Sequence, residues 1–375
     1  MKKNIIILSI IVVLLAVFII WGYLRQGAQD PGTIKIGFIG PITGDGAVYG
    51  VPLNQIAQLA VDEINQKGGI GGKLMEIIFE DGKCSGQDGA TAAQKLINVD
   101  KVKVITTLCS NESLAALPIA EAAKVAIISP GANSMELSGK SPFFFRIYPT
   151  VTAEGLVFAN LAYGQDKRKV AFISEQDDFT QGVYKAFTTN FTRLGGKVIK
   201  EEFLPGTRDF KTPLTKLKKQ NPDVLFINPL NPNTGNIILK QIKEMGWKIQ
   251  LIINDPMTGE PFLADNKDLL EGAWASEFKV DPTNSKFQHV IKAYKDKYGS
   301  DVPYQSFAQT EYDVVYLIKD AIKAVGYDGE KIAAWGHSIK DWQGASGLIT
   351  IDSNGDRVGG SVAEIIRGGK LEKIK

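Results

Sequence analysis

The chain has 375 residues, of which 44% are hydrophobic and 9% aromatic, enough to build two ordinary hydrophobic cores. Its charges nearly balance: without Lys2, Lys3 and Arg25, 40 basic residues remain against 41 acidic ones, a formal charge of −1. This balance argues against nucleic acid as a partner, because nucleic-acid-binding proteins carry a basic surface.

An apolar run fills positions 5–24, and Lys2 and Lys3 lie ahead of it. About 20 apolar residues span a bilayer as a helix. Residues 22–26 contain no small-residue cleavage site of the kind that ends a signal peptide. We therefore predict an uncleaved signal anchor at residues 1–29, with a removed signal peptide as the alternative. In either case the rest of the chain is expected outside the cytoplasm, in the periplasm or at the outer face of the cell membrane.

Apolar strands and amphipathic helices alternate from position 33 onward, a pattern typical of parallel β-α-β units. The predicted strands of a first lobe are 33–40, 74–81, 102–108 and 125–129. A second series has strands 168–174, 197–204, 223–229 and 249–255. Two long helices and two final strands follow, and an Asn354-Gly355 turn is expected to join those strands as a hairpin. The predicted fold class is α/β, with two doubly wound parallel-sheet lobes.

Motifs for cofactor chemistry and catalysis are missing from the sequence. The glycines after the first strand do not have the G-x-G-x-x-G spacing of a dinucleotide site, and neither a phosphate-binding loop motif nor G-x-S-x-G occurs. No constellation of Ser, Cys and carboxylate residues surrounds His289 or His337 in sequence, so each is expected at the surface or packed against a helix. We therefore expect no cofactor, no metal site and no catalytic residues.

Two cysteines occur in the whole chain, Cys84 after the second predicted strand and Cys109 at the end of the third. If these parallel strands are neighbours, their carboxyl-end loops come within reach of a disulfide, which an exported protein can keep. Two unpaired buried thiols are the alternative. Such a bridge would stabilise the fold by about 3 kcal/mol.

The helix after Cys109 is expected to begin with Ser110 or Asn111 as its N-cap, although Pro118 predicts a kink or a later start. A hydroxyl at a helix N-terminus can bind a carboxylate. The alternative is that Ser110 is an ordinary helix cap.

Several segments together resemble the type I periplasmic binding proteins for leucine, isoleucine and valine, which serve amino-acid ABC importers. They are "IKIGFIGPITGDGAVYG", "AVDEINQKGGIGGKLMEIIFED", "LCSNES" and "IISPGANSMEL", together with the two cysteines. The resemblance extends from residue 33 to the end. It implies two lobes joined by three crossovers: residues 33–148 with 278–350, and residues 149–277 with 351–375.

The resemblance also implies a ligand site in the cleft between the lobes. Ser110 matches a serine whose hydroxyl binds the ligand carboxylate. Gly131 and Asn133 match positions that bind the ammonium and carboxylate through backbone groups and a side-chain oxygen. Asp255 stands where the family has an acidic ammonium ligand in the second lobe.

Further cleft residues implied by the resemblance are Tyr49, Leu108, Phe179 and Leu230. This sequence departs from the family pattern at three positions. Asn133 replaces a usual hydroxyl residue, Asp255 is one methylene shorter than the common glutamate, and Leu230 replaces a tyrosine of branched-chain binders. Recognition of an amino-acid backbone is therefore expected, whereas side-chain specificity stays open.

The function implied is that of a monomeric extracytoplasmic receptor. It would capture an amino acid, branched-chain or similar, by closing its cleft and deliver it to an ABC permease in the membrane. One alternative is a sensor domain for a signalling partner, which the few residues ahead of the apolar run disfavour. The other is an enzyme using the same cleft, which the lack of a nucleophile and base disfavours.

Overall fold

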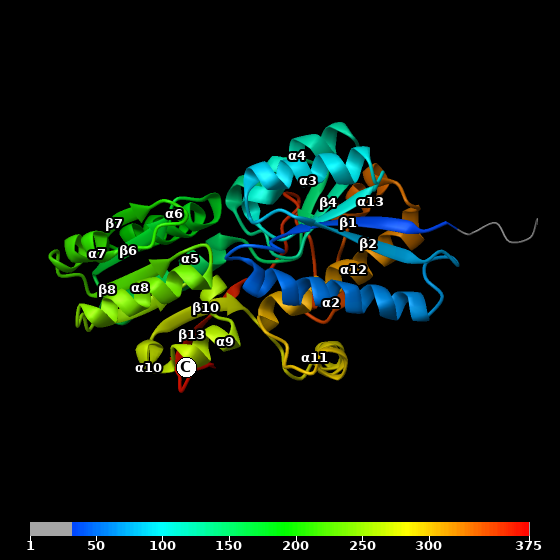
Figure 1. The fold of residues 1–375 in the computed structure, drawn as a ribbon. Helices are drawn as coiled ribbons and strands as arrows, with labels where there is room; N and C mark the ends of the chain where they lie inside the picture. Colours follow the sequence, from blue (N-terminus) through cyan, green and yellow to red (C-terminus); the bar gives the residue numbers. More distant parts are fainter. Residues whose placement is uncertain (1–31, 375) are drawn as a thin grey trace, which may run out of the picture.

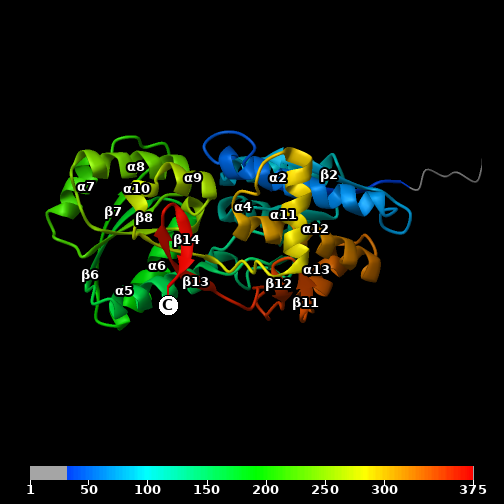
Figure 2. The same cartoon turned by 90° about the horizontal axis from the view of Figure 1, so that it is seen from below.

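The computed structural model describes residues 32–374, which form two α/β lobes lying side by side (Figures 1 and 2). The signal anchor predicted at residues 1–29 lies outside this range. Among the helices of residues 32–374, none is both long and apolar enough to cross a membrane.

Lobe 1 is built on a five-stranded parallel sheet with the order β2-β1-β3-β4-β5. Its strands are β1 (Ile34–Gly40), β2 (Met75–Asp81), β3 (Val104–Thr107), β4 (Ala126–Ser129) and β5 (Phe144–Arg146). Its helices are α2 (Ala47–Gln66), α3 (Gly86–Asn98), α4 (Ser110–Ala122), α11 (Ser285–Tyr298), α12 (Gln305–Val325) and α13 (Gly329–His337), with the short η1 (Met135–Leu137).

Helices cover both faces of this sheet, and the side chains of each strand alternate between the two faces. Ile36 and Phe38 of β1 pack toward α2 and α12, whereas Ile39 packs toward α3 and α4. This explains the nearly continuous apolar runs of the sequence.

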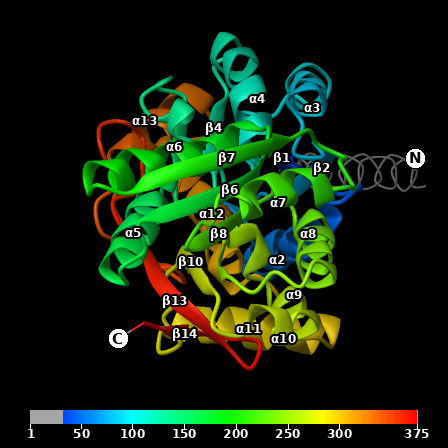
Figure 3. The same ribbon diagram turned by 90° about the vertical axis from the view of Figure 1, so that its left-hand side faces the viewer.

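Lobe 2 is built on a seven-stranded sheet with the order β14-β13-β10-β9-β8-β6-β7. Its strands are β6 (Lys169–Glu175), β7 (Lys197–Phe203), β8 (Val224–Asn228), β9 (Gln250–Ile253), β10 (Trp274–Phe278), β13 (Ser361–Arg367) and β14 (Lys370–Lys373). Helices α5 (Val151–Gly164) and α6 (Asp178–Arg193) cover one face (Figure 3). The other face is covered by α7 (Lys211–Lys218), α8 (Pro232–Glu244), α9 (Glu260–Asp265) and α10 (Lys267–Leu270). The short η2 (Asp255–Met257) follows β9.

The chain passes between the lobes three times: from β5 to α5, from β10 to α11, and finally toward β13. The predicted fold of two parallel-sheet lobes with three crossovers is thereby confirmed. The predicted hairpin around Asn354-Gly355 is wrong. Strand β12 (Gly347–Ile349) pairs with β11 (Trp342–Gly344), whereas β13 pairs with β10 and β14. The turn itself is local and is closed by a bridge between Ile351 and Arg357.

The lobe boundaries given above remain a proposal, and contacts of the last crossover refine them. Asp356 binds the guanidinium of Arg146, and Arg357 donates to the carbonyl of Ile147 at 2.8 Å. Because these partners belong to lobe 1, we propose that the chain enters lobe 2 after residue 357 rather than at 351.

Candidate functional site

A cavity of about 50 Å³ lies between the lobes, where the carboxyl ends of the strands face each other. Open α/β sheets bind ligands at this edge. The lining residues are Tyr49, Leu108, Cys109, Ser110, Gly131, Asn133, Phe179, Leu230, Asp255, Pro256, Tyr304 and Phe307. All eight cleft residues named from the sequence are in this set; that they bind a ligand remains a prediction.

The cap of α4 differs from the expectation. Cys109 is the N-cap residue and Ser110 is the first helical residue, and Pro118 lies inside the helix. The buried carboxylate of Glu112 accepts the backbone N–H groups of Cys109 (3.1 Å) and Cys84 (2.8 Å). Burial raises the pKa of Glu112 to about 8, although these two N–H bonds oppose the rise. One side chain thus holds both cysteine backbones at the start of the helix.

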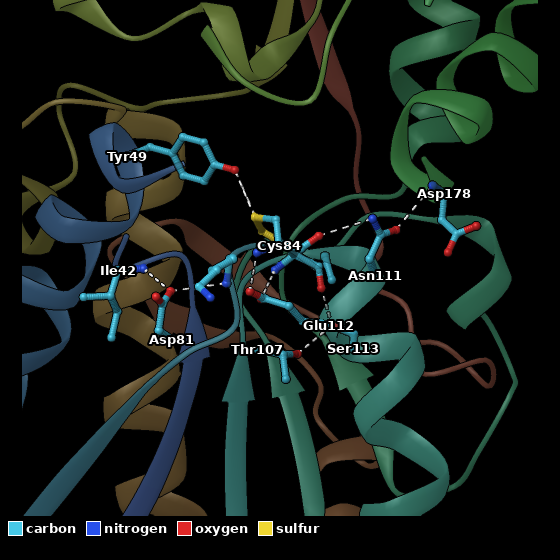
Figure 4. The surroundings of a disulfide bond; sticks show 12 residues. Ile42, Tyr49, Asp81, Cys84, Thr107, Asn111, Glu112, Ser113 and Asp178 are labelled. Carbon is cyan, nitrogen blue, oxygen red and sulfur yellow. Dashed lines mark hydrogen bonds between the residues drawn. A yellow bond between two sulfur atoms is a disulfide. The ribbon is translucent and has the colours of Figure 1, made fainter. Parts of the chain in front are cut away.

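A disulfide joins Cys84 to Cys109, with 5.2 Å between their Cα atoms (Figure 4). The predicted pairing is confirmed, but the reason given for it is wrong. Strand β1 lies between β2 and β3, so the two cysteine-bearing strands are not neighbours. The two loops instead meet beyond the end of β1. The hydroxyl of Tyr49 lies 3.0 Å from the sulfur of Cys84, which ties α2 to the disulfide.

Ser110 is held by the loop after β4. Its hydroxyl oxygen accepts the N–H of Ser134 at 3.1 Å, so its own proton remains free to donate to a ligand. Gly131 is required by close packing, because a Cβ atom there would lie 2.7 Å from the side chain of Leu108. The site therefore combines a hydroxyl donor with a tightly packed loop.

A buried guanidinium shapes the loop that carries Gly131 and Asn133. Arg146 donates to the carbonyls of Ala132 (3.2 Å) and Ser134 (2.7 Å), and it pairs with Asp356 at 2.7 Å. These bonds flank Asn133 on both sides. Lobe 1 thus fixes the backbone of this cavity wall through a side chain that does not line the cavity.

Asp255 supplies the carboxylate of the lobe 2 wall. It directly follows Asn254 after β9, and 4% of it is exposed. One of its oxygens accepts hydrogen bonds from Tyr148 (3.3 Å) and from Asn133 (3.5 Å). Burial raises the pKa of Asp255 to about 7, and the bond from Tyr148 opposes this. Both donors are neutral, so Asp255 lacks a cationic partner among the described residues.

A second buried acid, Glu154 of α5, lies near Asp255. Burial raises its pKa, and the Asp255 carboxylate raises it further. A positive group bound beside Asp255 would stabilise the charged form of these acids.

Apolar and aromatic groups form the remaining wall. The ring of Phe307 stacks on Tyr148 with a centroid distance of 4.6 Å, and Tyr304 meets Tyr49 edge to face at 6.0 Å. Phe179 comes from the first turn of α6. Tyr304, Phe307 and Pro256 were not named from the sequence, because they belong to no motif and reach the cavity only through the packing of α12 and η2.

The arrangement suits a small zwitterion. The hydroxyl of Ser110 and the first N–H groups of α4 can receive a carboxylate, while Asp255 can receive an ammonium from the opposite lobe. Cys84, Cys109 and Glu112 lie close enough together for a metal site, but both sulfurs are used in the disulfide.

Residues 33–363 match the family model described as periplasmic binding protein. The chain belongs to this family. The periplasmic binding protein family consists of solute-binding proteins rather than enzymes, and it implies an extracytoplasmic location.

Relatives of known name or structure agree with this. The chain is 28% identical to the leucine-, isoleucine-, valine-, threonine- and alanine-binding protein of Pseudomonas aeruginosa, over 86% of this chain and 87% of that one. A leucine-binding protein, LivK of Thermotoga maritima, superposes with a TM-score of 0.84 at 26% identity and 91% and 98% coverage. LivJ of Streptococcus pneumoniae, solved with isoleucine, gives a TM-score of 0.81 at 27% identity with the same coverage.

Proposed function

We propose that this protein is an extracytoplasmic receptor that binds an α-amino acid, branched-chain or similar, and delivers it to an ABC permease. The observation that carries the proposal is the position of Asp255, a buried carboxylate of lobe 2 without a cation, facing Ser110 and Asn133 of lobe 1. An amino acid supplies the missing ammonium and a carboxylate for the opposite wall.

Binding and closure are coupled in this proposal. Ser110 and Asp255 belong to different lobes, so a ligand can touch both only when the lobes meet. The ligand then stabilises the closed form, which is the form a permease would recognise.

Thermal denaturation of the purified protein, with and without each of the twenty L-amino acids, tests the proposal. A ligand at 100 times its Kd stabilises the native state by about 2.7 kcal/mol, so the melting temperature should rise for at least one amino acid. If no amino acid raises it, the proposed ligand class is wrong.

The role of Ser110 has a matched control. Ser110→Ala removes one donor to a charged acceptor and should weaken binding by about 1.5 to 3 kcal/mol. Ser285 is also the first residue of a helix, α11, but it does not line the cavity. Ser285→Ala should therefore leave the affinity unchanged, and an equal loss in both variants would contradict the assignment of Ser110.

Delivery to a permease can be tested in cells. Uptake of the radiolabelled amino acid should depend on this protein and should be reduced in the Ser110→Ala variant at low concentrations of the amino acid. If signalling changes and uptake does not, the protein is a sensor rather than a transport receptor.

A further inference from the structure

Asn111 connects the two lobes outside the cavity (Figure 4). It is the second residue of α4 and directly follows Ser110. Its side-chain nitrogen donates to the carbonyl of Cys84 at 3.3 Å, and its side-chain oxygen accepts the backbone N–H of Asp178 at 3.3 Å. Asn111 does not line the cavity. One side chain therefore contacts the disulfide loop of lobe 1 and a helix of lobe 2.

The N–H of Asp178 belongs to a helix end that needs an acceptor. Asp178 is the first residue of α6, and the first N–H groups of a helix have no partner within the helix. The N-cap, Asp177, uses its side chain for the N–H of Thr180 at 3.0 Å. Asn111 thus acts as an additional cap supplied by the other lobe. When the lobes separate, this bond is broken.

The orientation of the Asn111 amide is set by the disulfide loop. A carbonyl on one side and an N–H on the other are compatible with only one placement of its nitrogen and oxygen. The Cys84 carbonyl therefore turns the amide so that its oxygen faces α6. This helix carries Phe179, which lines the cavity.

We propose that Asn111 is a positioning residue that caps α6 across the cleft in the closed form and thereby slows release of the ligand without touching it. The proposal rests on the proposed receptor function. Other polar contacts also join the lobes: Tyr148 and Asn133 donate to Asp255. Arg208 pairs with Asp45 at 3.2 Å, through side chains that are 58% and 40% exposed. Such exposed ion pairs contribute little because water screens them, whereas the amide of Asn111 is held on one side by the carbonyl of Cys84.

Two substitutions remove the same bond from opposite lobes. Asn111→Ala removes the acceptor. Asp178→Pro removes the N–H, and proline is well suited to the first position of a helix. The preceding residue, Asp177, has φ −145° and ψ 168°, an extended conformation that a following proline accepts. Asp178→Ala keeps the N–H and is its control. Asn190→Ala is the control for the loss of an amide, because Asn190 bonds within its own helix.

The measurement is the release rate of the tightest-binding of L-leucine, L-isoleucine and L-valine by stopped flow. Each single substitution should raise the rate about 3- to 10-fold, the range expected for one hydrogen bond, and both controls should leave it unchanged. The double variant should release the ligand no faster than the faster single variant, because both substitutions remove the same hydrogen bond between the lobes. A wild-type rate in Asn111→Ala, or effects of the two substitutions that multiply, would overturn the proposal.

If none of these amino acids binds, that result counts against the proposed function and not against the cap. The cap can then be tested without a ligand. Small-angle scattering of the protein without ligand should then give a larger radius of gyration for Asn111→Ala than for Asn190→Ala. Equal radii would overturn the role of Asn111 in closure.

Discussion

Replacing Asp255 with asparagine tests whether the proposed site binds a positively charged group of the ligand. The substitution keeps the size of the side chain and a contact with Tyr148, but it removes the charge. Because Asp255 is 4% exposed and its two donors are neutral, a ligand ammonium would be its cationic partner in the closed cavity. Removing one member of such a desolvated pair costs about 2 to 5 kcal/mol, or about 30- to 5,000-fold in Kd.

Stability should change in the opposite direction. Burial raises the pKa of Asp255 to about 7, so the unliganded fold becomes less stable as the pH rises from about 4 to 7, where only the unfolded chain has lost this proton. Asp255→Asn removes that cost. The variant should therefore be at least as stable as the wild type at pH 8 while binding far more weakly.

Titration calorimetry with the amino acid found by screening measures the affinity, and urea denaturation without ligand measures the stability. If Asp255→Asn binds within a factor of about two of the wild type, a difference of only ~0.4 kcal/mol, then Asp255 does not receive the ammonium and the reasoning fails.

Three further outcomes are expected. Affinity for a zwitterionic ligand should fall as the pH drops below about 7, by at most tenfold per pH unit, because a proton on Asp255 must leave before the ammonium binds; calorimetry from pH 5 to 8 that gives a flat profile would contradict this. Burial keeps Glu112 protonated up to about pH 8 in the folded state only, so the wild-type fold loses stability as the pH rises from 5 to 8. Glu112→Gln should reduce this loss by up to about 1.4 kcal/mol per pH unit. Urea denaturation that gives the same dependence of stability on pH in both proteins would argue against it. Asp356→Ala should destabilise the fold by about 3 to 5 kcal/mol because it leaves Arg146 buried and without its acidic partner. Asp301 belongs to an exposed ion pair, so the control Asp301→Ala should change stability by less than about 0.5 kcal/mol. Equal melting temperatures of the two variants would refute this prediction.

The sequence predicts the strands well, because both sheets are covered on both faces and leave long apolar runs. It does not predict their order. The assumption that consecutive strands are neighbours fails at β1, which lies between β2 and β3. The same limit explains the wrong hairpin at Asn354-Gly355: the turn is encoded locally, but strand partners are chosen by packing across the whole lobe.

For the candidate site, the resemblance named residues that do gather at one cavity, whereas local rules failed at the helix cap. A thiol is not a preferred cap, so Cys109 was passed over for its neighbours; its partner Glu112 occupies the third helical position, where a capping box has its acid. No sequence motif marks Tyr304 and Phe307 as cavity residues, because only the packing of α12 against the first crossover brings them to the cavity.

The late return of the chain to lobe 2 has a consequence for how the protein folds. Strand β13 pairs with β10, yet the whole of α11, α12 and α13 lies between them in sequence and belongs to lobe 1. Lobe 1 needs these three helices to complete its fold, and lobe 2 needs β13. During synthesis, neither lobe can therefore be completed until nearly the whole chain has been made. Pairing over such separations is slow, and until β13 arrives the edge of β10 is open to other strands. A chain of this design is therefore expected to stay incompletely folded until its synthesis is nearly finished.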